Sequence, residues 1–394
     1  MSTSNQSKIL VTIPRIPFPL NSGGRIAIYD TLSILSKKYK LTLIIIDDNK
    51  SNINYLNEMK KFTDDIHFFS KSKFRFYLNS IFGLITGKPL QVGYFYFNDI
   101  QKLVNNLSYK HDLFLSFMIR TSLYGIDLDI NKIHYSIDSM YLNYQNSQRN
   151  TTSFLWNLIY KIELPLLYKF EKQHVVKYNM TTFVNKEEAK FWGQFGKTIN
   201  LPHGVNENIL NHKSFNIKYK NTVTFIGRMD YQPNIEAVLW FAKNVLSHLE
   251  NEIQFLVIGG FATPDIIQLE NEYKNIRILG FVEDPYVIIR SSICNVAPMQ
   301  SGGGLQTKIL MSMAVESIVI MSKLSSFAIE GIENDFNAII EDNPLKIAEK
   351  INMIYTKPDL FSKMRIEAKK LIENHYSNDV IENKMNEIIK QTIL

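Results

Sequence analysis

Cysteine is the scarcest residue that bears on chemistry, since the chain of 394 residues has only Cys294. A single cysteine excludes an internal disulfide framework and any zinc site built from several cysteines. Cys294 begins a short apolar stretch, so we expect a buried and inert thiol. The eight histidines show no spacing typical of metal ligands. The sequence therefore predicts no metal site.

Long hydrophobic runs are also missing. No uninterrupted apolar stretch approaches the roughly 20 residues that a membrane-spanning helix needs. The first residues, MSTSNQSK, are polar and lack the apolar segment of a signal peptide. We therefore expect a cytoplasmic protein.

Long basic runs are absent too, although the net charge is +6. A positive balance suits an anionic partner such as a nucleotide phosphate, an acidic lipid surface or a nucleic acid. No arginine-rich stripe of the kind that binds nucleic acid occurs in the chain. We therefore expect no nucleic-acid partner.

Strand and helix patterns alternate through the first half of the chain. Residues 9–13 and 41–46 are short apolar runs, and residues 25–38 between them carry apolar side chains at helical spacing. Further strands are expected at 65–69, 112–117, 132–138 and 180–184, and a long helix at 154–178. Nearly all-apolar strands are typical of a parallel sheet covered on both faces, which predicts a doubly wound α/β domain.

A polar stretch at 206–221 interrupts this pattern, and we interpret it as a linker. The alternation then restarts, with strands expected at 222–226, 254–258, 276–279, 294–298 and 317–321, and helices at 234–249, 344–357, 359–374 and 379–393. A chain of this length exceeds the size at which one hydrophobic core keeps growing. The sequence therefore predicts two Rossmann-like domains, 1–205 and 206–375, followed by a terminal helix at 376–394.

Glycines follow many of these strands, at Gly23-Gly24, Gly227, Gly259-Gly260, Gly280 and Gly302 to Gly304. Ligands of doubly wound sheets bind beyond the carboxyl ends of the strands. The three consecutive glycines let the backbone approach a ligand, and the following helix carries Lys308 in its first turn. Unpaired helix N–H groups together with a lysine favour a phosphate. The alternative is an ordinary turn with a spare lysine.

Several stretches have the sequence of a known family, in that family's order. They are IPRIPFPLNSGGRIAIYDTLSIL, LPHGVN, FIGRMDYQPNIEAVLWF, FLVIGG, ILGFVEDP, VAPMQSGGGLQTKILMSMA and AIEGI. With these motifs the chain resembles GT-B glycosyltransferases of the family 4 and "glycosyl transferases group 1" type. The resemblance implies an α/β fold in which two Rossmann-like domains face each other across a cleft, with the C-terminal helix returning to the first domain.

The resemblance also implies a donor site for a nucleotide-diphosphate sugar. Arg228 and Lys308 match the two cations that contact the diphosphate, and a guanidinium suits a bidentate contact. A structural salt bridge is the alternative for Arg228. Val282 matches the position whose backbone reads the base, and Gly23 with Gly24 would lie against the pyrophosphate and the acceptor. The remaining donor-binding positions are Gly302, Gly303, Gly304, Leu305, Gln306 and Thr307.

By the same resemblance the enzyme is a retaining transferase that needs no metal or other cofactor. Its acceptor would be a glycan or a lipid-linked glycan in the biosynthesis of a cell-surface polysaccharide. Asp138, at the end of a predicted strand, would act on the acceptor or in catalysis, and a helix N-cap is its alternative role. Arg120 is interpreted as a surface arginine rather than an acceptor contact.

Two departures from the family pattern concern the ribose and the first helix. Met311 stands where the family has a glutamate that binds the donor ribose, and the earlier glutamate of the pair would align near Gly303 and is absent. Glu316 lies about 140° further around the helix and does not substitute. Pro233-Asn234 replaces a lysine of other members. The alternatives are therefore an inactive GT-B subunit that binds a glycan or a partner, and another GT-B enzyme such as a sugar-nucleotide epimerase.

The most apolar and aromatic segment is 74–85, FRFYLNSIFGLI, which is flanked by Lys71, Lys73 and Arg75. We interpret it as a core helix of the first domain. The alternative is a helix that rests on an anionic membrane surface, at the inner face of the membrane.

Overall fold

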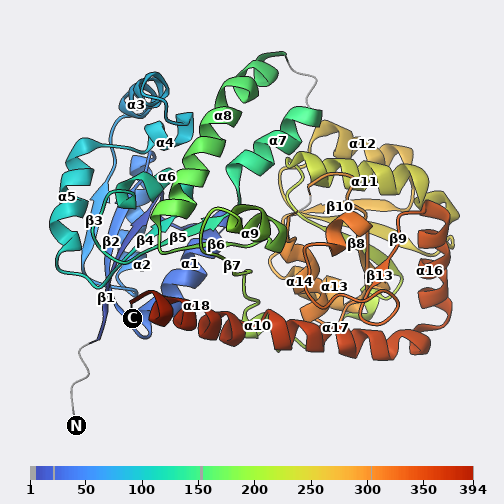
Figure 1. The fold of residues 1–394 in the computed structure, drawn as a ribbon. Coiled ribbons are helices and arrows are strands. Elements are labelled where there is room, and N and C mark those ends of the chain that lie inside the picture. Colours follow the sequence, from blue (N-terminus) through green and yellow to red (C-terminus); the bar gives the residue numbers. More distant parts are fainter. Residues whose placement is uncertain (1–5, 21–22, 151–153, 303, 394) are drawn as a thin grey trace, which may run out of the picture. The chain divides into compact units, whose positions relative to one another are not determined.

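The computed structural model describes residues 6–20, 23–150, 154–302 and 304–393, and the chain divides into two compact units (Figure 1). The first unit comprises Met1–Pro202 together with Glu382–Leu394, and the second comprises His203–Ile381. The polar stretch 206–221, interpreted above as a linker, belongs to the second unit. It forms α10 (Glu207–Leu210) and the 3-10 helix η3 (Ile217–Tyr219) there.

The first unit contains a parallel sheet of seven strands in the order β3-β2-β1-β4-β5-β6-β7. The strands are β1 (Lys8–Ile13), β2 (Lys40–Ile46), β3 (Ile66–Phe69), β4 (Leu113–Phe117), β5 (Lys132–Ile137), β6 (Met180–Phe183) and β7 (Thr198–Asn200). In β1 and β2 every residue after the first is buried, as expected for strands with helices on both faces.

Eleven helical segments connect these strands within the described residues of the first unit. They are α1 (Gly23–Ser36), η1 (Lys50–Tyr55), α2 (Leu56–Met59), α3 (Lys73–Ile85), α4 (Leu90–Tyr94), α5 (Asn98–Ser108), α6 (Met118–Ser122), η2 (Leu123–Gly125), α7 (Met140–Asn150), α8 (Phe154–Lys177) and α9 (Lys186–Gly193). None of the helices in the described parts of the chain is long and apolar enough to cross a membrane.

The second unit repeats this architecture with six parallel strands in the order β10-β9-β8-β11-β12-β13. The strands are β8 (Thr222–Ile226), β9 (Gln254–Ile258), β10 (Ile276–Gly280), β11 (Cys294–Ala297), β12 (Val319–Met321) and β13 (Ile339–Ile340). Cys294 is fully buried and burial raises its pKa to about 12, which agrees with the inert thiol expected.

The remaining helices of the second unit cover both faces of its sheet (Figure 1). They are α11 (Gln232–Asn244), η4 (Leu246–His248), α12 (Pro264–Glu272), α13 (Pro285–Ser291), α14 (Thr307–Ala314), α15 (Lys323–Ser326), α16 (Pro344–Thr356), η5 (Pro358–Phe361) and α17 (Ser362–His375), and the last helix of the chain is α18 (Asn378–Ile393). Helix α11 illustrates how the local sequence specifies a helix. Pro233 lies in its first turn, where the missing N–H is no loss, and Ile235, Val238 and Phe241 are buried on one face.

Helix α18 begins in the second unit, and its residues from Glu382 onward pack on the first. Glu382 accepts ion pairs from Lys37 at 2.7 Å and Lys38 at 3.3 Å, and Asn131 donates a hydrogen bond to the carbonyl of Ile393. The α/β fold with two Rossmann-like domains and a returning C-terminal helix, which the sequence predicted, is thus confirmed.

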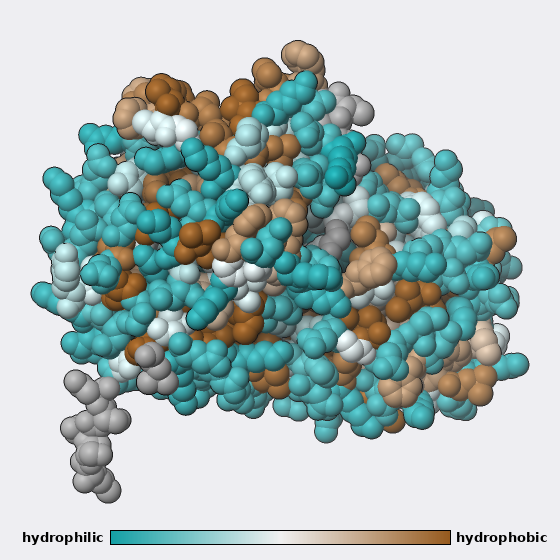
Figure 2. Space-filling view, in the orientation of Figure 1, coloured by the Kyte–Doolittle hydropathy of each residue, from teal (hydrophilic) through white to brown (hydrophobic). Residues whose placement is uncertain are grey.

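Helix α3 was interpreted above as a core helix of the first domain. In the structure its apolar face is exposed rather than buried in a core. Only Phe76, Ser80 and Gly83 of this helix are buried, while Phe82 is 65% and Ile85 77% exposed. Figure 2 shows hydrophobic residues gathered on the surface over α3 and over the upper end of α8. The core-helix interpretation is therefore wrong for most of the helix, because Phe76 is its only large apolar side chain that is fully buried.

In the second unit, glycines allow three loops to meet at the carboxyl edge of the sheet. The N–H of Gly227 donates to the carbonyl of Ile258 at 3.0 Å, and that of Gly259 to the carbonyl of Gly280 at 2.8 Å. Gly259 has φ +145°, and a Cβ built on it would lie 1.7 Å from the carbonyl oxygen of Gly227. A residue with a side chain therefore does not fit at position 259.

We expect Gly259→Ala to destabilise the protein, because the new methyl group overlaps backbone and the alanine must adopt an unfavourable φ. A fall in melting temperature of roughly 8 °C or more, equivalent to a few kcal/mol, is expected by calorimetry. Gly260→Ala is the matched control, since a Cβ there meets nothing within 4 Å. Equal melting temperatures for the two variants would contradict this account.

Candidate functional site

The second unit places Arg228 and the glycine-rich loop on neighbouring strands. The strand order reverses between β8 and β11, which pair in parallel through Cys294 and Asn295. Arg228 lies two residues beyond the end of β8, and the loop leading to α14 follows β11. Such a reversal leaves a crevice at the carboxyl edge, where ligands of doubly wound sheets bind. The two candidate cations thus follow the two strands between which the order reverses, with Arg228 in the loop after β8 and Lys308 in the first turn of α14.

Asn234 connects these two loops. The ammonium group of Lys308 donates to Asn234 Oδ1 at 2.7 Å, and Asn234 Nδ2 donates to the carbonyl of Arg228 at 2.8 Å. The side chain of Asn234 is buried against Gly227, where a Cβ would lie 2.6 Å from Nδ2. The residue that departs from the family pattern therefore positions both the lysine and the backbone of the arginine.

Lys308 has surroundings that disfavour a charge. Its ammonium nitrogen lies 4.2 Å from the centre of the Phe225 ring and 3.3 Å from the sulfur of Met299. Burial lowers the pKa of Lys308 to about 7. The lysine is consequently only partly protonated at neutral pH, rather than carrying the permanent charge assumed from the sequence. An anion bound beside it would raise the pKa again.

Arg228 is more exposed and is paired with a carboxylate. Its Nε donates to Asp230 Oδ1 at 3.0 Å, and a terminal nitrogen contacts Oδ2 at 2.5 Å. The guanidinium also lies over the ring of Phe261, 4.9 Å from its centre. The salt bridge considered above as an alternative therefore exists. Since the side chain of Arg228 is 49% exposed, the guanidinium still has a face open to a ligand.

The first residues of the glycine-rich loop are held against α11. Gly302 has φ +82°, and a Cβ there would lie 3.2 Å from Pro233, while Gly304 has open space in the corresponding direction. The side chain of Ser301 donates to Glu236 on α11. Gly303, the third glycine expected to bind the donor, lies outside the described residues. The loop therefore packs directly on the first turn of α11.

The other donor-binding candidates of this loop lead into α14. Leu305 and Gln306 precede the helix, and Thr307 is its first residue. Gln306 donates to the carbonyl of Gly302 at 3.1 Å, but its own side-chain oxygen is buried and has no partner among the described residues. A buried acceptor of this kind calls for a water molecule or a ligand group.

Met311 and Glu316, the two residues that bear on ribose binding, both have partners within the protein. The hydroxyl of Tyr286 donates to the sulfur of Met311 at 3.3 Å. Glu316 forms ion pairs with Arg290 at 2.9 Å and Lys369 at 3.1 Å beyond the end of α14. Glu316 is thereby engaged in packing α14 against α13 and α17.

Val282 lies just beyond β10, after Gly280 with φ +65° and Phe281, which is 86% exposed. The side chain of Val282 packs with the cluster that includes Ile288 and Tyr286. Its backbone is therefore at the same carboxyl edge as the loops after β8 and β9, as required of a group that reads a base.

The first unit has its own cavity at the corresponding place in the sheet. The strand order reverses between β1 and β4, and a cavity of 260 Å³ lies there. Gly24 and Asp138, both chosen from the sequence, line it, whereas Gly23 is the first residue of α1. The full lining is Arg15, Gly24, Arg25, Gln91, Met118, Ile119, Arg120, Ser136, Ile137, Asp138 and Met140.

Three arginines distinguish this cavity, and two of them were not anticipated. Arg15 follows β1, and Arg25, in the first turn of α1, donates to the carbonyls of Phe18 and Pro19. Arg120, expected at the surface, lines the cavity and lies over the Phe95 ring at 5.7 Å. Burial and then the charge of Arg15 lower the pKa of both Arg25 and Arg120. This crowding of like charges favours an anionic group between them.

Two cavity residues other than glycine adopt left-handed backbone conformations, Met118 with φ +57° and Ile137 with φ +67°. Met118 directly follows β4, and Ile137 is the last residue of β5. Both strands lead to the cavity. Such conformations are strained for these residue types and are concentrated at functional sites. These strained conformations support the interpretation that the cavity is part of a functional site.

Asp138 does not act as the N-cap of α7, because Ser139 has that position. Ser139 Oγ accepts from the N–H of Leu142 at 3.2 Å and donates to Glu171 at 2.6 Å. The N–H of Ser139 donates to Glu188 at 2.8 Å. Buried carboxylates thus fix the turn after β5, and the Asp138 side chain is left at the cavity.

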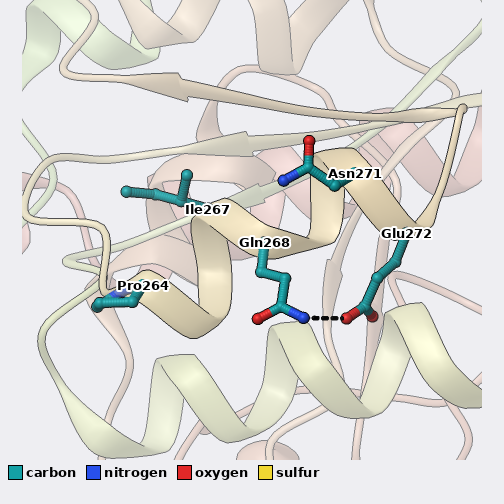
Figure 3. Close-up of a pocket in the computed structure, with 5 residues that line it drawn as sticks. All are labelled: Pro264, Ile267, Gln268, Asn271 and Glu272. Carbon is teal, nitrogen blue, oxygen red and sulfur yellow. Dashed lines mark hydrogen bonds between the residues drawn. The ribbon is translucent and has the colours of Figure 1, made fainter.

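A larger surface hollow, of about 550 Å³, has none of these features. It lies along α12, and Pro264, Ile267, Gln268, Asn271 and Glu272 line it (Figure 3). Gln268 points toward Glu272 and donates to it at 2.8 Å, while Asn271 points the other way. One helix with no cationic side chain at the hollow does not form a phosphate site. Among the described residues, no group of three or more histidine, cysteine or acidic side chains is placed to hold a metal ion.

Residues 220–357 match the family model described as "Glycosyl transferases group 1". The match contains every candidate that the motifs placed in the second unit, from Arg228 to Lys308. The resemblance predicted from the sequence is confirmed.

Solved glycosyltransferase structures resemble the whole chain, not only the group 1 portion. HepE from Anabaena, crystallised with UDP and glucose, is 12% identical with a TM-score of 0.67, over 98% of this chain and 100% of HepE. Sucrose-phosphate synthase from Thermosynechococcus elongatus is 13% identical with a TM-score of 0.68, over 98% of both chains. A glycosyltransferase from Rickettsia africae is 18% identical with a TM-score of 0.63, over 99% of both. At such identities the likeness concerns the fold. No curated protein sequence matches the chain.

Within the group 1 portion, sequence reasoning found the cations but missed the residue between them. Asn234 was noted only as a replacement, although a buried amide after a glycine-arginine turn can bridge two loops. In the first unit, Arg15 lies between two prolines in the loop after β1. Because ligands bind beyond the ends of such strands, this position could have identified Arg15 as a candidate from the sequence.

We expect the buried carboxyl of Glu188 to make stability fall as pH rises. Burial, followed by the charge of Asp138, raises the pKa of Glu188 from 4.5 to about 9. The folded state therefore binds more protons than the unfolded one between these values, and the destabilisation is complete only above pH 9. Glu188→Gln should match the wild type near pH 4.5 and exceed its stability at pH 8 by several kcal/mol, at about 1.4 kcal/mol for each pH unit between the two pKa values.

Melting temperatures of both proteins between pH 4.5 and 9 measure this effect. Glu187→Gln, at an exposed neighbouring position, is the control and should leave the pH profile unchanged. A difference between Glu188→Gln and wild type that stays constant with pH would show that Glu188 is ionised throughout this range.

Proposed function

We propose that the protein is a retaining glycosyltransferase that moves a sugar from a nucleoside-diphosphate sugar to a hydroxyl of a glycan or lipid-linked acceptor. The observation that carries the proposal is the arrangement of Arg228, Asn234 and Lys308 around the strand reversal of the group 1 unit. The structures of HepE with UDP and with UDP-glucose support a nucleotide sugar as the donor.

In this proposal the second unit stabilises the leaving diphosphate. The bond between the anomeric carbon and the diphosphate oxygen breaks, the acceptor oxygen forms the new bond to that carbon, and its proton goes to the departing diphosphate. Arg228 supplies a permanent charge, and Lys308 becomes fully protonated when the diphosphate approaches. The loop at Gly302 and Gly304 and the first N–H groups of α14 add donors that are already oriented. These groups would neutralise the diphosphate without a metal ion.

The first unit would hold the acceptor. Asp138 lies at the cavity and would accept a hydrogen bond from an acceptor hydroxyl. Arg15, Arg25 and Arg120 around it favour an acceptor that carries a negative group, such as a phosphate or a carboxylate. A phosphate-linked lipid carrier or an acidic glycan of a cell-surface polysaccharide has this chemistry. The reaction would then take place at the inner face of a membrane.

A second candidate function is that of an inactive GT-B subunit that binds a glycan or a partner enzyme. It is favoured by one observation, the hydrogen bond from Tyr286 to Met311 in place of a ribose carboxylate. Both functions predict the same fold, so nucleotide binding and turnover must distinguish them.

Titration calorimetry with UDP, GDP and their common sugars tests the donor site. We expect binding, and we expect proton uptake of about half a proton near pH 7, because Lys308 with a pKa of about 7 becomes fully protonated. Affinity should therefore fall as pH rises above 7. Repeating the titration in buffers with different ionisation enthalpies measures the uptake.

Lys308→Met should abolish the proton uptake and weaken binding by roughly tenfold or more. Lys346→Met, at an exposed lysine of α16, is the control and should behave as wild type. If no nucleotide binds at millimolar concentration, the transferase proposal fails. Binding without release of nucleoside diphosphate in the presence of donor sugar would favour the inactive subunit.

The role of Met311 gives a separate prediction. If the donor ribose lies beside α14, Met311→Glu supplies the carboxylate that accepts hydrogen bonds from its hydroxyls, and nucleotide binding should tighten by roughly threefold to tenfold. The matched control is Met311→Gln, which has similar size and a weaker acceptor. Unchanged affinity in both variants would place the ribose elsewhere.

A further inference from the structure

Helix α3 is amphipathic with its apolar face turned outward. Its exposed apolar residues recur at spacings of three and four, which places them on one side of the helix. They are Phe74 (69% exposed), Tyr77 (60%), Leu78 (48%), Ile81 (56%), Phe82 (65%) and Ile85 (77%). A core helix of a globular domain has the opposite arrangement. Tyr77 contacts the ring of Tyr94 at its edge, and every residue of this face remains at least 48% exposed in the described chain.

The inner face of α3 explains this orientation. Asn79 donates to the carbonyl of Tyr96 at 2.7 Å, and Ser80 donates to the carbonyl of Leu90 at 2.8 Å. A Cβ on Gly83 would lie 2.7 Å from the Cα of Gly93, so α3 and α4 cross in close contact. Phe76, which is fully buried, packs on the rings of Phe95 and Phe97. Together these contacts hold α3 on the unit with its other large apolar side chains outside.

The first turns of α8 extend the apolar surface. Their exposed residues are Phe154 (86%), Leu155 (64%), Trp156 (49%), Leu158 (48%) and Ile162 (45%). The buried carboxylate of Glu163 accepts from the N–H of Leu90 on α4, which connects α8 to the helix that carries α3. Figure 2 shows both segments on one side of the first unit, and we name these eleven residues the apolar face.

The charges around the apolar face have one sign. Lys73, Arg75 and Lys161 are exposed there, and Lys88 lies just beyond the end of α3. The sequence has no aspartate or glutamate from 66 to 98 or from 139 to 162. A rim of cations around aromatic and aliphatic side chains is the composition of helices that lie in the interface of an anionic bilayer.

We propose that the apolar face binds the surface of a bilayer that contains anionic phospholipid. The aromatic and aliphatic side chains of α3 and α8 enter the boundary between headgroups and acyl chains, and the lysines and Arg75 contact the lipid phosphates. The rigid attachment of α3 through α4 means that no rearrangement of the unit is needed for binding. This surface goes beyond the transferase proposal, because binding to vesicles requires neither nucleotide nor acceptor.

Co-sedimentation of the full chain with vesicles tests the proposal. Vesicles of phosphatidylcholine and phosphatidylglycerol in equal parts should bind the protein roughly tenfold or more tightly than vesicles of phosphatidylcholine alone. High salt should weaken the binding to anionic vesicles. The emission of Trp156 should shift to the blue on binding, and Trp156→Phe should remove the shift, since Trp192 is fully buried and Trp240 packs on the core of the second unit.

Variants of the apolar face locate the contact. Phe74→Ser with Phe82→Ser should weaken vesicle binding by roughly tenfold or more. Phe215→Ser with Leu360→Ser is the matched control, because these residues of the second unit are 59% and 65% exposed. Lys73→Glu with Arg75→Glu should remove the preference for anionic lipid, and Lys346→Glu with Lys357→Glu should preserve it.

Leu155→Ser with Leu158→Ser on α8 tests the same surface independently, should the α3 variant fold poorly. The proposal would be overturned if the wild-type protein did not bind anionic vesicles at low salt. It would also be overturned if the control variants lost as much vesicle binding as the variants of the apolar face. A concentration-dependent dimer that the α3 variant disrupts would instead assign the apolar face to a second copy of the chain. UDP binding should be the same in all these variants as in the wild type. A failure of the wild-type protein to bind UDP would therefore count only against the transferase proposal.

Discussion

Parallel pairing of strands is the constraint on which the rest of this structure depends. Because every strand of a parallel sheet ends at the same edge, the loops after β8, β9, β10 and β11 meet, although they are separated by up to 70 residues in the chain. The meeting is tight enough that Gly259 contacts the backbone of Gly227. In the first unit the same rule brings the loops after β1, β4 and β5 to one cavity. Each unit thus has a site at the point where its strand order reverses.

The cations of the second unit show how packing modifies a motif. Lys308 is held by Asn234 and lies over Phe225, and this apolar environment brings its pKa to about 7. Arg228, on the neighbouring loop, is exposed and keeps a carboxylate partner. One group therefore offers a permanent charge and the other a charge that depends on what binds.

Much of the fold could be predicted from the sequence, and the reason is local. Runs such as 222–226 and 254–258 coincide with β8 and β9, because buried parallel strands need apolar residues at every position. The edge strands β7 and β13 have three and two residues and were missed, because so short a segment has no period of its own. Helix α3 was recognised as amphipathic, but periodicity gives only the existence of an apolar face and not its direction.

The sequence by itself determined the two α/β units and the glycines at the strand ends, because strand pattern and backbone freedom depend on neighbouring residues. The resemblance of its motifs to a known family singled out Arg228 and Lys308. Only the tertiary structure decided that Asn234 joins these cations, that Ser139 rather than Asp138 caps α7, and that three arginines surround the cavity of the first unit. It also decided that the apolar side of α3 faces outward. These features depend on contacts between residues far apart in the chain, and burial, which sets both pKa and exposure, is a property of the folded whole.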